Sequence, residues 1–276
     1  MPQRLAPAPR PVPLTLASRA DLHDLYERAV QNPVFDASFI ARTFARHRGR
    51  PARVLREDFC GTAALCAAWV KRHPDNRAYG IDLDRATLEW GIRRHLIPLG
   101  QRAARVTLIA QDVRDRTDFV SDAVVAFNFS YFGFRDVTTL GDYFRHVHAG
   151  LARDGILYLD LYGGPEAMRV QRERTRHRGF TYIWDQAAFN PISHEITCHI
   201  DFEFPDGSAR RRAFTYHWRL WSIPELIALA REAGFADVIC YWEGTDEAKG
   251  TGNGIYRPSR KGDDALSYTA YLVCLK

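Results

Sequence analysis

Two kinds of hydrophobic pattern alternate along the first part of the chain. Short runs that contain consecutive apolar residues occupy residues 52–58, 77–84, 105–113, 122–130 and 155–164. Between them, apolar side chains recur at helical spacing over residues 61–73, 85–100 and 140–152. Short apolar strands that alternate with helices are typical of a parallel sheet with both faces covered. We therefore expect an α/β fold of the doubly wound kind.

The pattern then changes to alternation of apolar and polar residues, which predicts antiparallel strands. Three runs show it: 180–189, 194–204 and 209–221. Asp206 and Gly207 separate the last two runs, and an Asp-Gly pair in that place is a strong hairpin signal. We predict an antiparallel β insertion of three strands after the fifth strand of the main sheet.

After the insertion, the earlier pattern of helices and strands returns. Ser222, with Glu225 three residues on and Gly234 past the end, predicts a capped helix. Residues 236–244 and 266–276 predict two closing strands. The polar, glycine-rich residues 245–264 between them predict either a loop that closes over a site or an ordinary surface loop.

The N-terminal segment differs from the rest. Residues 1–20 are rich in proline, so we expect a mobile tail without a helix. Ser18 and Asp21 predict a capping box for a helix over residues 22–30, and residues 37–47 predict a second helix. The expected organisation is a tail (1–20), a main domain (21–162 and 222–276) and an inserted β subdomain (163–221).

Composition narrows the class of protein. The chain has 276 residues, 46% of them hydrophobic, and a mild net charge of +5 that is dispersed apart from two Arg-rich segments, 169–178 and 209–214. The five cysteines show no zinc-binding spacing, so we expect no metal site and reduced thiols, as in a cytoplasmic protein. No apolar run approaches the length of a membrane span, and residues 1–20 lack the apolar core of a signal peptide.

In a sheet of this kind, ligands bind at the first strand–turn–helix, which here comprises residues 54–66. Gly61 allows a close backbone approach, and the following helix offers free N–H groups. However, the turn has neither the G-x-G-x-x-G pattern of dinucleotide sites nor the GK[ST] of a P-loop. Phe59 stands where the first glycine would be and would crowd a pyrophosphate.

Acidic residues mark three consecutive strand ends: Glu57, Asp82 and Asp112. Asp82 is placed to accept hydrogen bonds from both hydroxyls of a ribose. Asp112 is placed to accept from an adenine amino group, with the Val113 N–H near a ring nitrogen. Three carboxylates without a phosphate cradle suit a nucleoside that carries a positive charge, and they suit NAD poorly.

These features together resemble the class I S-adenosylmethionine-dependent methyltransferases. The resemblance covers residues 53–161 and 222–276, through "VLREDFCGT", "GIDLD", "AQDV", "DAVVAFNFS" and "LARDGILYLDL". It implies a Rossmann-like, seven-stranded sheet whose last strand lies antiparallel beside the sixth, and an insert that covers the substrate. It also implies S-adenosylmethionine as the cofactor.

The resemblance assigns roles residue by residue. The family's first motif, acid-x-Gly-x-Gly-x-Gly, maps onto Glu57, Phe59, Gly61 and Ala63, so two glycines are missing. Asn128, after the fourth strand, corresponds to a position at which the family often has a residue near the sulfonium. The full set expected to bind the cofactor is Tyr26, Glu57, Phe59, Cys60, Gly61, Asp82, Leu83, Asp112, Val113 and Asn128.

Each assignment has a structural alternative. Glu57 could pair with Arg56, and Asp82 could cap the next helix, although Asp84 suits that task better. Asp112 could cap a turn. Asn128 could stabilise a loop, and Tyr26 could belong to the core.

Methyl transfer from a sulfonium is an in-line displacement in which positioning alone can contribute about 7–11 kcal/mol. No dedicated catalytic residue is therefore required. The candidates for removing a proton or orienting the acceptor are Tyr131, His199, His217 and Asp201. Candidates for binding the acceptor are Tyr131, Tyr256 and Arg219, although Arg219 could equally pair with Glu225.

The sequence leaves three functions open. The first is methyl transfer to a nitrogen or oxygen of a small molecule, without a membrane or nucleic-acid partner. The second is methylation of tRNA or protein, which the Arg-rich segments permit, although "NFSY" replaces an Asn-Pro-Pro-Tyr signature after the fourth strand. The third is a non-methylating enzyme that uses S-adenosylmethionine. A homodimer is an option that the sequence does not decide.

Overall fold

The structure, a computed structural model, describes residues 14–246 and 251–276. Its main sheet has eight strands in the order β11-β10-β12-β5-β4-β1-β2-β3. The strands are β1 (Val54–Asp58), β2 (Arg77–Asp82), β3 (Val106–Ala110), β4 (Ser121–Ala126), β5 (Leu151–Gly163), β10 (Asp237–Asp246), β11 (Thr251–Pro258) and β12 (Tyr268–Leu275). Strands β1 to β5 are parallel, and β12 lies antiparallel between β5 and β10. The doubly wound α/β fold is thus confirmed.

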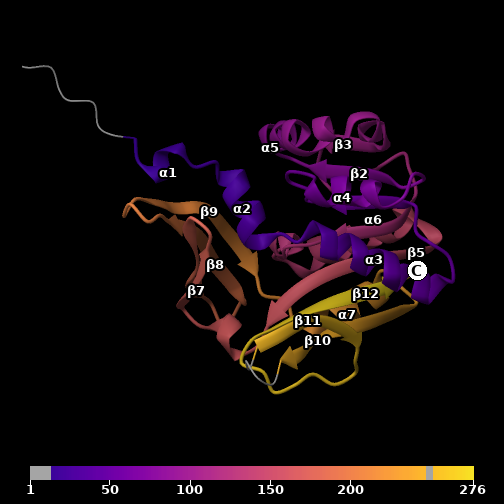
Figure 1. Cartoon of the computed structure of the whole chain (residues 1–276). Helices are drawn as coiled ribbons and strands as arrows, with labels where there is room; N and C mark the ends of the chain where they lie inside the picture. The colour runs from indigo at the N-terminus through magenta and orange to yellow at the C-terminus, as the bar shows by residue number, and fades with distance from the viewer. Residues whose placement is uncertain (1–13, 247–250) are drawn as a thin grey trace, which may run out of the picture.

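Helices cover both faces of this sheet (Figure 1). One core lies under α3 (Pro33–Arg48), α4 (Ala64–Arg72) and α5 (Arg85–Gly91), and the other lies under α6 (Val137–Gly150) and α7 (Ile223–Glu232). A π-helical turn (Ile92–Leu96) and a 3-10 segment (Ile97–Arg105) continue α5. Ser222 and Glu225 form the predicted capping box of α7.

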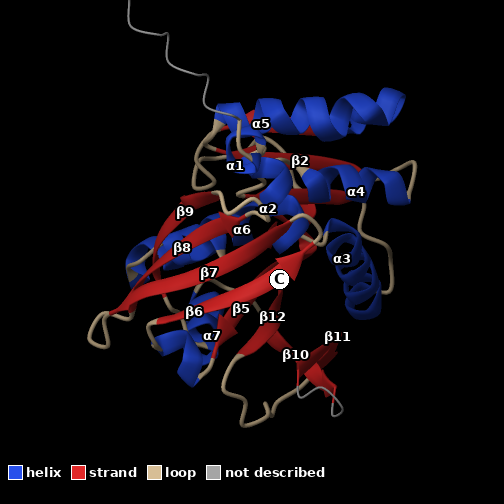
Figure 2. Ribbon diagram, turned by 60° about the vertical axis from the view of Figure 1, so that its left-hand side comes forward, coloured by secondary structure: helices blue, strands red, loops and turns tan. Residues whose placement is uncertain are grey.

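The insertion after β5 forms a second, antiparallel sheet (Figure 2). A 3-10 turn (Pro165–Met168) leads into its strands, β6 (Gln171–His177), β7 (Phe180–Phe189), β8 (Glu195–Glu203) and β9 (Ala209–Arg219). The hairpin predicted at Asp206 and Gly207 joins β8 to β9, and Gly207 has a φ of +81° that favours glycine.

The two sheets each have one strand more than the sequence predicted. The additional strands are β6, in the Arg-rich segment, and β11, in the segment predicted as a loop. Both are edge strands that are largely exposed, so neither shows the apolar alternation by which strands are recognised. The predicted count of seven strands in the main sheet was wrong for this reason.

The N-terminal helices differ from the expectation in two ways. Residues 1–13 of the predicted tail lie outside the described residues, whereas residues 14–20 contain the short helix α1 (Leu16–Arg19). The Leu16 N–H donates to Asp206 Oδ2 at 2.8 Å, which ties α1 to the hairpin of the second sheet. Asp21 alone caps α2 (Leu22–Val30). Among the described residues, no helix has the length and apolar character needed to cross a membrane.

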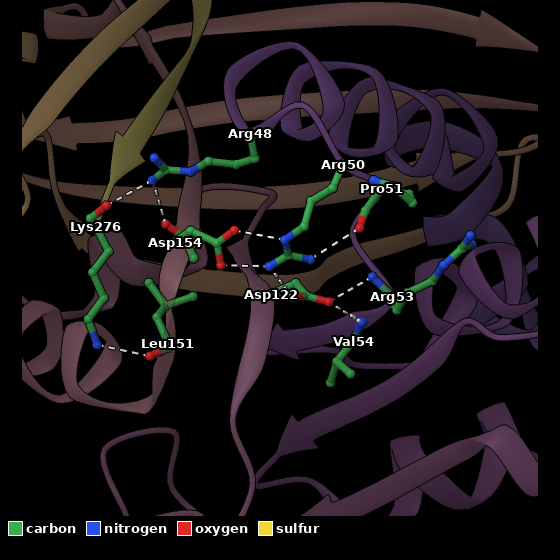
Figure 3. A network of polar contacts seen from close by, with 10 residues as sticks. Arg48, Arg50, Pro51, Arg53, Val54, Asp122, Leu151, Asp154 and Lys276 are labelled. Carbon is green, nitrogen blue, oxygen red and sulfur yellow. Dashed lines mark hydrogen bonds and ion pairs between the residues drawn. The ribbon is translucent and has the colours of Figure 1, made fainter.

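A network of charges fastens the edge of the main sheet at which β1 and β4 begin (Figure 3). The Arg50 guanidinium bridges Asp154 and Asp122, at 2.6 to 2.8 Å. Asp122 in turn accepts from the Val54 N–H at 2.9 Å. Arg48 donates to the Lys276 carbonyl at 2.9 Å. These contacts hold α3 and the C-terminal residue against the sheet, at the edge opposite to the strand ends described next.

Candidate active site

The loop between β1 and α4 keeps a glycine-like backbone at three positions. Phe59, Gly61 and Ala63 have φ values of +57°, +52° and +59°. These are the positions at which the motif named above carries glycine, although only Gly61 is one. A left-handed conformation costs a residue with a side chain about 1–2 kcal/mol. The loop therefore adopts at all three positions a backbone conformation that favours glycine, at the cost of strain at Phe59 and Ala63.

Two strand-end carboxylates hold this loop in place. Asp82 Oδ2 accepts from the Gly61 N–H at 2.8 Å, and Glu57 Oε2 accepts from the Cys66 N–H at 3.0 Å. Asp84, not Asp82, caps α5. The alternative in which Glu57 pairs with Arg56 is wrong, because Arg56 Nε donates to Asp58 Oδ1 at 2.6 Å in a buried pair.

The third acid lies at the end of β3. Asp112 forms a double hydrogen bond with the Arg114 guanidinium, at 3.0 and 2.6 Å, which lowers the pKa of Asp112. Val113 is buried, and its carbonyl accepts from Arg56 at 2.7 Å. Leu83, next to Asp82, is 71% exposed. A ligand that binds here therefore meets Asp112 with Arg114 already attached to it.

A cavity of about 300 Å³ lies beside the ends of β4, β5 and β12, and we call it the carboxylate cavity. Asp36 from α3 and Asp160 from β5 line it. Burial raises the pKa of each of these two carboxyls to about 7, and it raises the pKa of nearby Glu57 to about 8. Repulsion from Asp36 adds to both of the other shifts. Among the described residues, no Arg or Lys pairs with any of the three acids.

Asp160 also shapes the loop after β4. Its carboxylate accepts from the N–H groups of Asn128 and Phe129, at 2.8 and 3.0 Å. Both of these residues have a φ of +57°. Two successive left-handed residues are strained, and the Asp160 carboxylate holds them in that conformation. Asn128 therefore lines the carboxylate cavity from a fixed loop.

A second cavity, of about 370 Å³, lies between the carboxyl ends of β4 and β5 and the inner face of the second sheet. Aromatic rings form much of its wall, among them Tyr162, Trp184, Tyr216 and Trp218, and we call it the aromatic cavity. It shares Val30, Asn128, Phe129 and Thr269 with the carboxylate cavity. The two cavities therefore adjoin.

Helix α2 connects the two parts of the molecule over the site (Figure 1). Glu27 accepts from Thr62, in the loop after β1, at 2.5 Å and lies 2.6 Å from His95 Nε2. One residue earlier, the Tyr26 ring lies 5.0 Å from that of Phe214 in the second sheet and lines the aromatic cavity. The helix thus covers both the loop and the aromatic cavity.

The candidate proton acceptors lie away from both cavities. Tyr131 is buried, and its hydroxyl donates to the Asp160 carbonyl at 2.8 Å. Ile200, Tyr216 and Trp218 line the aromatic cavity, so His199 and His217, which alternate with them, lie on the opposite face of the second sheet. Asp201 shares that outer face, where it pairs with Arg172.

Of the other candidates for binding the acceptor, one lies at a cavity and one does not. Arg219 donates to Glu225 at 2.8 Å and lies over the Trp221 ring. It therefore forms the structural pair with Glu225 that the sequence left open as an alternative to acceptor binding. Tyr256 lines the carboxylate cavity. Within the described residues, no group of His, Cys, Asp or Glu has the arrangement of a metal site.

Comparison with known proteins gives structural matches only. No family model matches the chain, and no curated protein matches it significantly in sequence. A methyltransferase from Clostridium acetobutylicum, described as S-adenosylmethionine-dependent, is 15% identical with a TM-score of 0.66, over 92% of this chain and 97% of that one. The chain has the fold of S-adenosylmethionine-dependent methyltransferases.

Two further solved structures share this fold over nearly their whole length. The amino pentose methyltransferase CalS10 from Micromonospora echinaspora, determined with S-adenosylmethionine bound, is 18% identical with a TM-score of 0.62, over 91% of this chain and 95% of that one. The sugar N-methyltransferase KedS8 from Streptoalloteichus is 18% identical with a TM-score of 0.60, over 99% and 100%. The likeness includes the second sheet, since nearly the whole chain is matched.

Sequence reasoning missed several acids of this site, among them Glu27, Asp36, Asp160 and Glu243, the last of which lines the aromatic cavity. Asp160 carries a recognisable signal, because it is an acid within the otherwise apolar run "ILYLDLY". Asp36 and Glu27 lie on helices of mixed character, and Glu243 lies in a strand of mixed character. For these three, only the tertiary contacts reveal a place at the site.

Proposed function

We propose that the chain is an enzyme that transfers the methyl group of S-adenosylmethionine to a nitrogen or oxygen of a small-molecule acceptor. The acceptor binds in the aromatic cavity. The observation that carries the proposal is the set of three acids at the carboxyl edge of the sheet, Asp36, Glu57 and Asp160, which are buried or half-buried and have no Arg or Lys partner among the described residues. A buried carboxylate favours a nearby positive charge.

The residues present fit this cofactor. Asp82 would accept hydrogen bonds from the ribose hydroxyls through its carboxylate. Asp112 and Val113 would bind the adenine. Glu57 and the loop through Gly61 are the residues for the methionine end, and Asn128, which lines both cavities, is the residue for the reacting centre. When bound, S-adenosylmethionine supplies an electrophilic methyl group on a sulfonium.

The task of the chain is to position the acceptor and to exclude water. The aromatic cavity adjoins the carboxylate cavity through Asn128, Phe129 and Thr269, so a ligand in one is next to a ligand in the other. Val30, at the end of α2, also lines both cavities at this junction. Holding two reactants in line in a site shielded from water can contribute about 7–11 kcal/mol to such a displacement.

The aromatic cavity favours the small-molecule assignment over methylation of tRNA or protein. It lies between α2, the carboxyl edge of the main sheet and the second sheet, which suits a metabolite better than a tRNA or a protein segment. Five free cysteines, four of them buried, suit the reducing cytoplasm, where we place the enzyme. Use of the aminopropyl group instead of the methyl group is distinguished by the mass of the product.

The cofactor assignment is tested with Asp82→Ala in calorimetric titration with S-adenosylmethionine. We expect the wild-type protein to bind at micromolar concentration and Asp82→Ala to bind at least tenfold more weakly, because the carboxylate for the ribose is lost. The matched control is Asp84→Ala, which removes the α5 cap two residues away and should change affinity less than twofold. Equal affinity of wild type and Asp82→Ala would retire the ribose assignment.

The acceptor is identified by incubating the enzyme and labelled S-adenosylmethionine with a metabolite extract. The labelled product is then analysed by mass spectrometry. A product heavier by one methyl group supports the proposal. A product heavier by an aminopropyl group would replace it with the third function.

A further inference from the structure

Among the described residues, the wall of the aromatic cavity carries formal charge of one sign only. Glu173 and Glu243 are its two charged side chains, and no Arg, Lys or His is among the described residues that line it. The Trp218 ring centroid lies 4.3 Å from that of Tyr216 and 6.1 Å from that of Trp184. Carboxylates and aromatic faces both stabilise a cation. The wall therefore favours a positively charged ligand over a phosphate or a carboxylate.

Glu243 is connected across three neighbouring strands. Its Oε2 accepts from the Thr269 hydroxyl at 2.8 Å, and its Oε1 accepts from the Gly254 N–H at 2.8 Å. The Tyr256 hydroxyl lies 2.8 Å from Thr269 Oγ1. Glu243, Tyr256 and Thr269 come from β10, β11 and β12 in turn. The cross-strand pairing of Glu243 with Tyr256 aligns the three groups.

The direction of these hydrogen bonds leaves one position open. Thr269 has a single hydroxyl hydrogen, which it donates to Glu243, so Tyr256 is the donor in its own bond with Thr269. A hydroxyl oxygen accepts two hydrogen bonds, and Tyr256 occupies one of the two. Thr269 lines both cavities, so the remaining lone pair is available to a donor at their junction.

We propose that the aromatic cavity takes its acceptor as a protonated amine and that Glu243 receives a proton from it. An N–H proton passes through the Thr269 hydroxyl to the Glu243 carboxylate, which becomes a neutral acid and later releases the proton to water. The freed nitrogen lone pair forms the N–C bond while the carbon–sulfur bond breaks and its electron pair stays on sulfur. This proposal rests on the proposed methyl transfer and specifies its acceptor.

The charge preference is tested first, without a methyl donor. Three probes of the same shape are titrated by calorimetry at pH 7, with and without S-adenosylhomocysteine: 2-phenylethylamine, 2-phenylethanol and 3-phenylpropionate. We expect the ammonium to bind at least tenfold more tightly than the other two. Glu243→Gln should remove most of this preference. Glu203→Gln, which makes the same change of charge on the outer face of the second sheet, should retain it.

Equal binding of the three probes, or tighter binding of the carboxylate, would overturn the proposal. Since no cofactor chemistry is involved, this result is independent of the proposed function. A protein that failed to bind S-adenosylmethionine and yet preferred the ammonium would lose the proposed function and keep a cationic ligand site.

The proton transfer is tested with labelled S-adenosylmethionine and two amines. At pH 7, 2-phenylethylamine is protonated, whereas aniline is not. We expect Glu243→Gln to slow methylation of 2-phenylethylamine by about 100-fold, in the range of general base catalysis, and methylation of aniline by less than threefold. Equal slowing of both amines would show a merely structural role for Glu243. Failure of the wild-type enzyme to methylate any amine that binds would also overturn the proposal.

Discussion

At the scale of single residues, the acids of the carboxylate cavity determine how the site responds to pH. Asp36 and Asp160 have pKa values raised to about 7 by burial, and Glu57 has a pKa raised to about 8. A raised pKa of an acid stabilises the folded state below the unfolded pKa, near 4, and this stabilisation is lost as the pH rises through the folded pKa. The ligand-free protein therefore loses stability between about pH 4 and pH 8. The ligand-free protein favours the protonated acids, whereas a bound cation favours the ionised acids.

We predict that the affinity for S-adenosylmethionine, relative to S-adenosylhomocysteine, rises by at least about fivefold between pH 6 and pH 8.5. Only S-adenosylmethionine carries the sulfonium charge, so the ratio isolates the effect of the ionised acids. Asp36→Asn should flatten the curve, because it removes one carboxylate. Its amide oxygen can still accept the hydrogen bond that the Tyr271 hydroxyl donates to Asp36 Oδ1 at 3.3 Å. Both affinities are measured by calorimetry. Parallel pH curves for the two ligands in the wild-type protein would contradict the prediction.

At the scale of elements, α2 is the connection between the two halves of the site. Glu27 holds the loop after β1 through Thr62 and reaches His95, while Tyr26 contacts the second sheet. Asp24, on the same helix, makes exposed ion pairs with Arg28 and Arg94. Exposed ion pairs contribute about 0–1 kcal/mol, whereas hydrogen bonds to a partly buried carboxylate contribute more.

We predict that Glu27→Ala increases the dissociation rate of S-adenosylmethionine at least fivefold, because the helix that covers the loop loses its contact with Thr62. Asp24→Ala is the matched control and should change the rate less than twofold. Stopped-flow fluorescence measures both. If the two variants dissociate the cofactor at the same rate, α2 does not retain it.

At the scale of the whole molecule, the charge distribution bears on the macromolecular alternative. The Arg-rich segments lie in β6 and β9 of the second sheet, where Arg172, Arg174 and Arg211 pair with Asp201 and Glu203. Around these ion pairs, the surface therefore carries charges of both signs. Tight RNA binding needs a run of unpaired cations that contact phosphates.

We predict that a fluorescent tRNA binds weakly, with a salt dependence equivalent to fewer than about two phosphate contacts. Fluorescence anisotropy over a series of salt concentrations gives this slope. A slope of several phosphate contacts at micromolar affinity would favour tRNA as the acceptor and would count against the small-molecule assignment.

The parts of the fold that could be predicted are those with a buried face. Strands β1, β2, β4 and β5 are covered on both sides, so each contains consecutive apolar residues and their sequence is distinctive. The same burial explains the strand-end acids, since Glu57 and Asp82 interrupt an apolar pattern at a regular place. Exposed edge strands have no such constraint, and for that reason β6 and β11 could not be recognised.

The sequence by itself determined the alternation of strands and helices, the place of the insertion and the acids at successive strand ends, because local periodicity and burial leave a direct trace in residue order. Only the tertiary structure decided which distant side chains share a cavity. Asp36, Asp160 and Glu243 meet the site from three separate elements. His199 and His217 lie on the far face of the second sheet because the register of strand pairing, which no single strand reveals, assigns each side chain to one face.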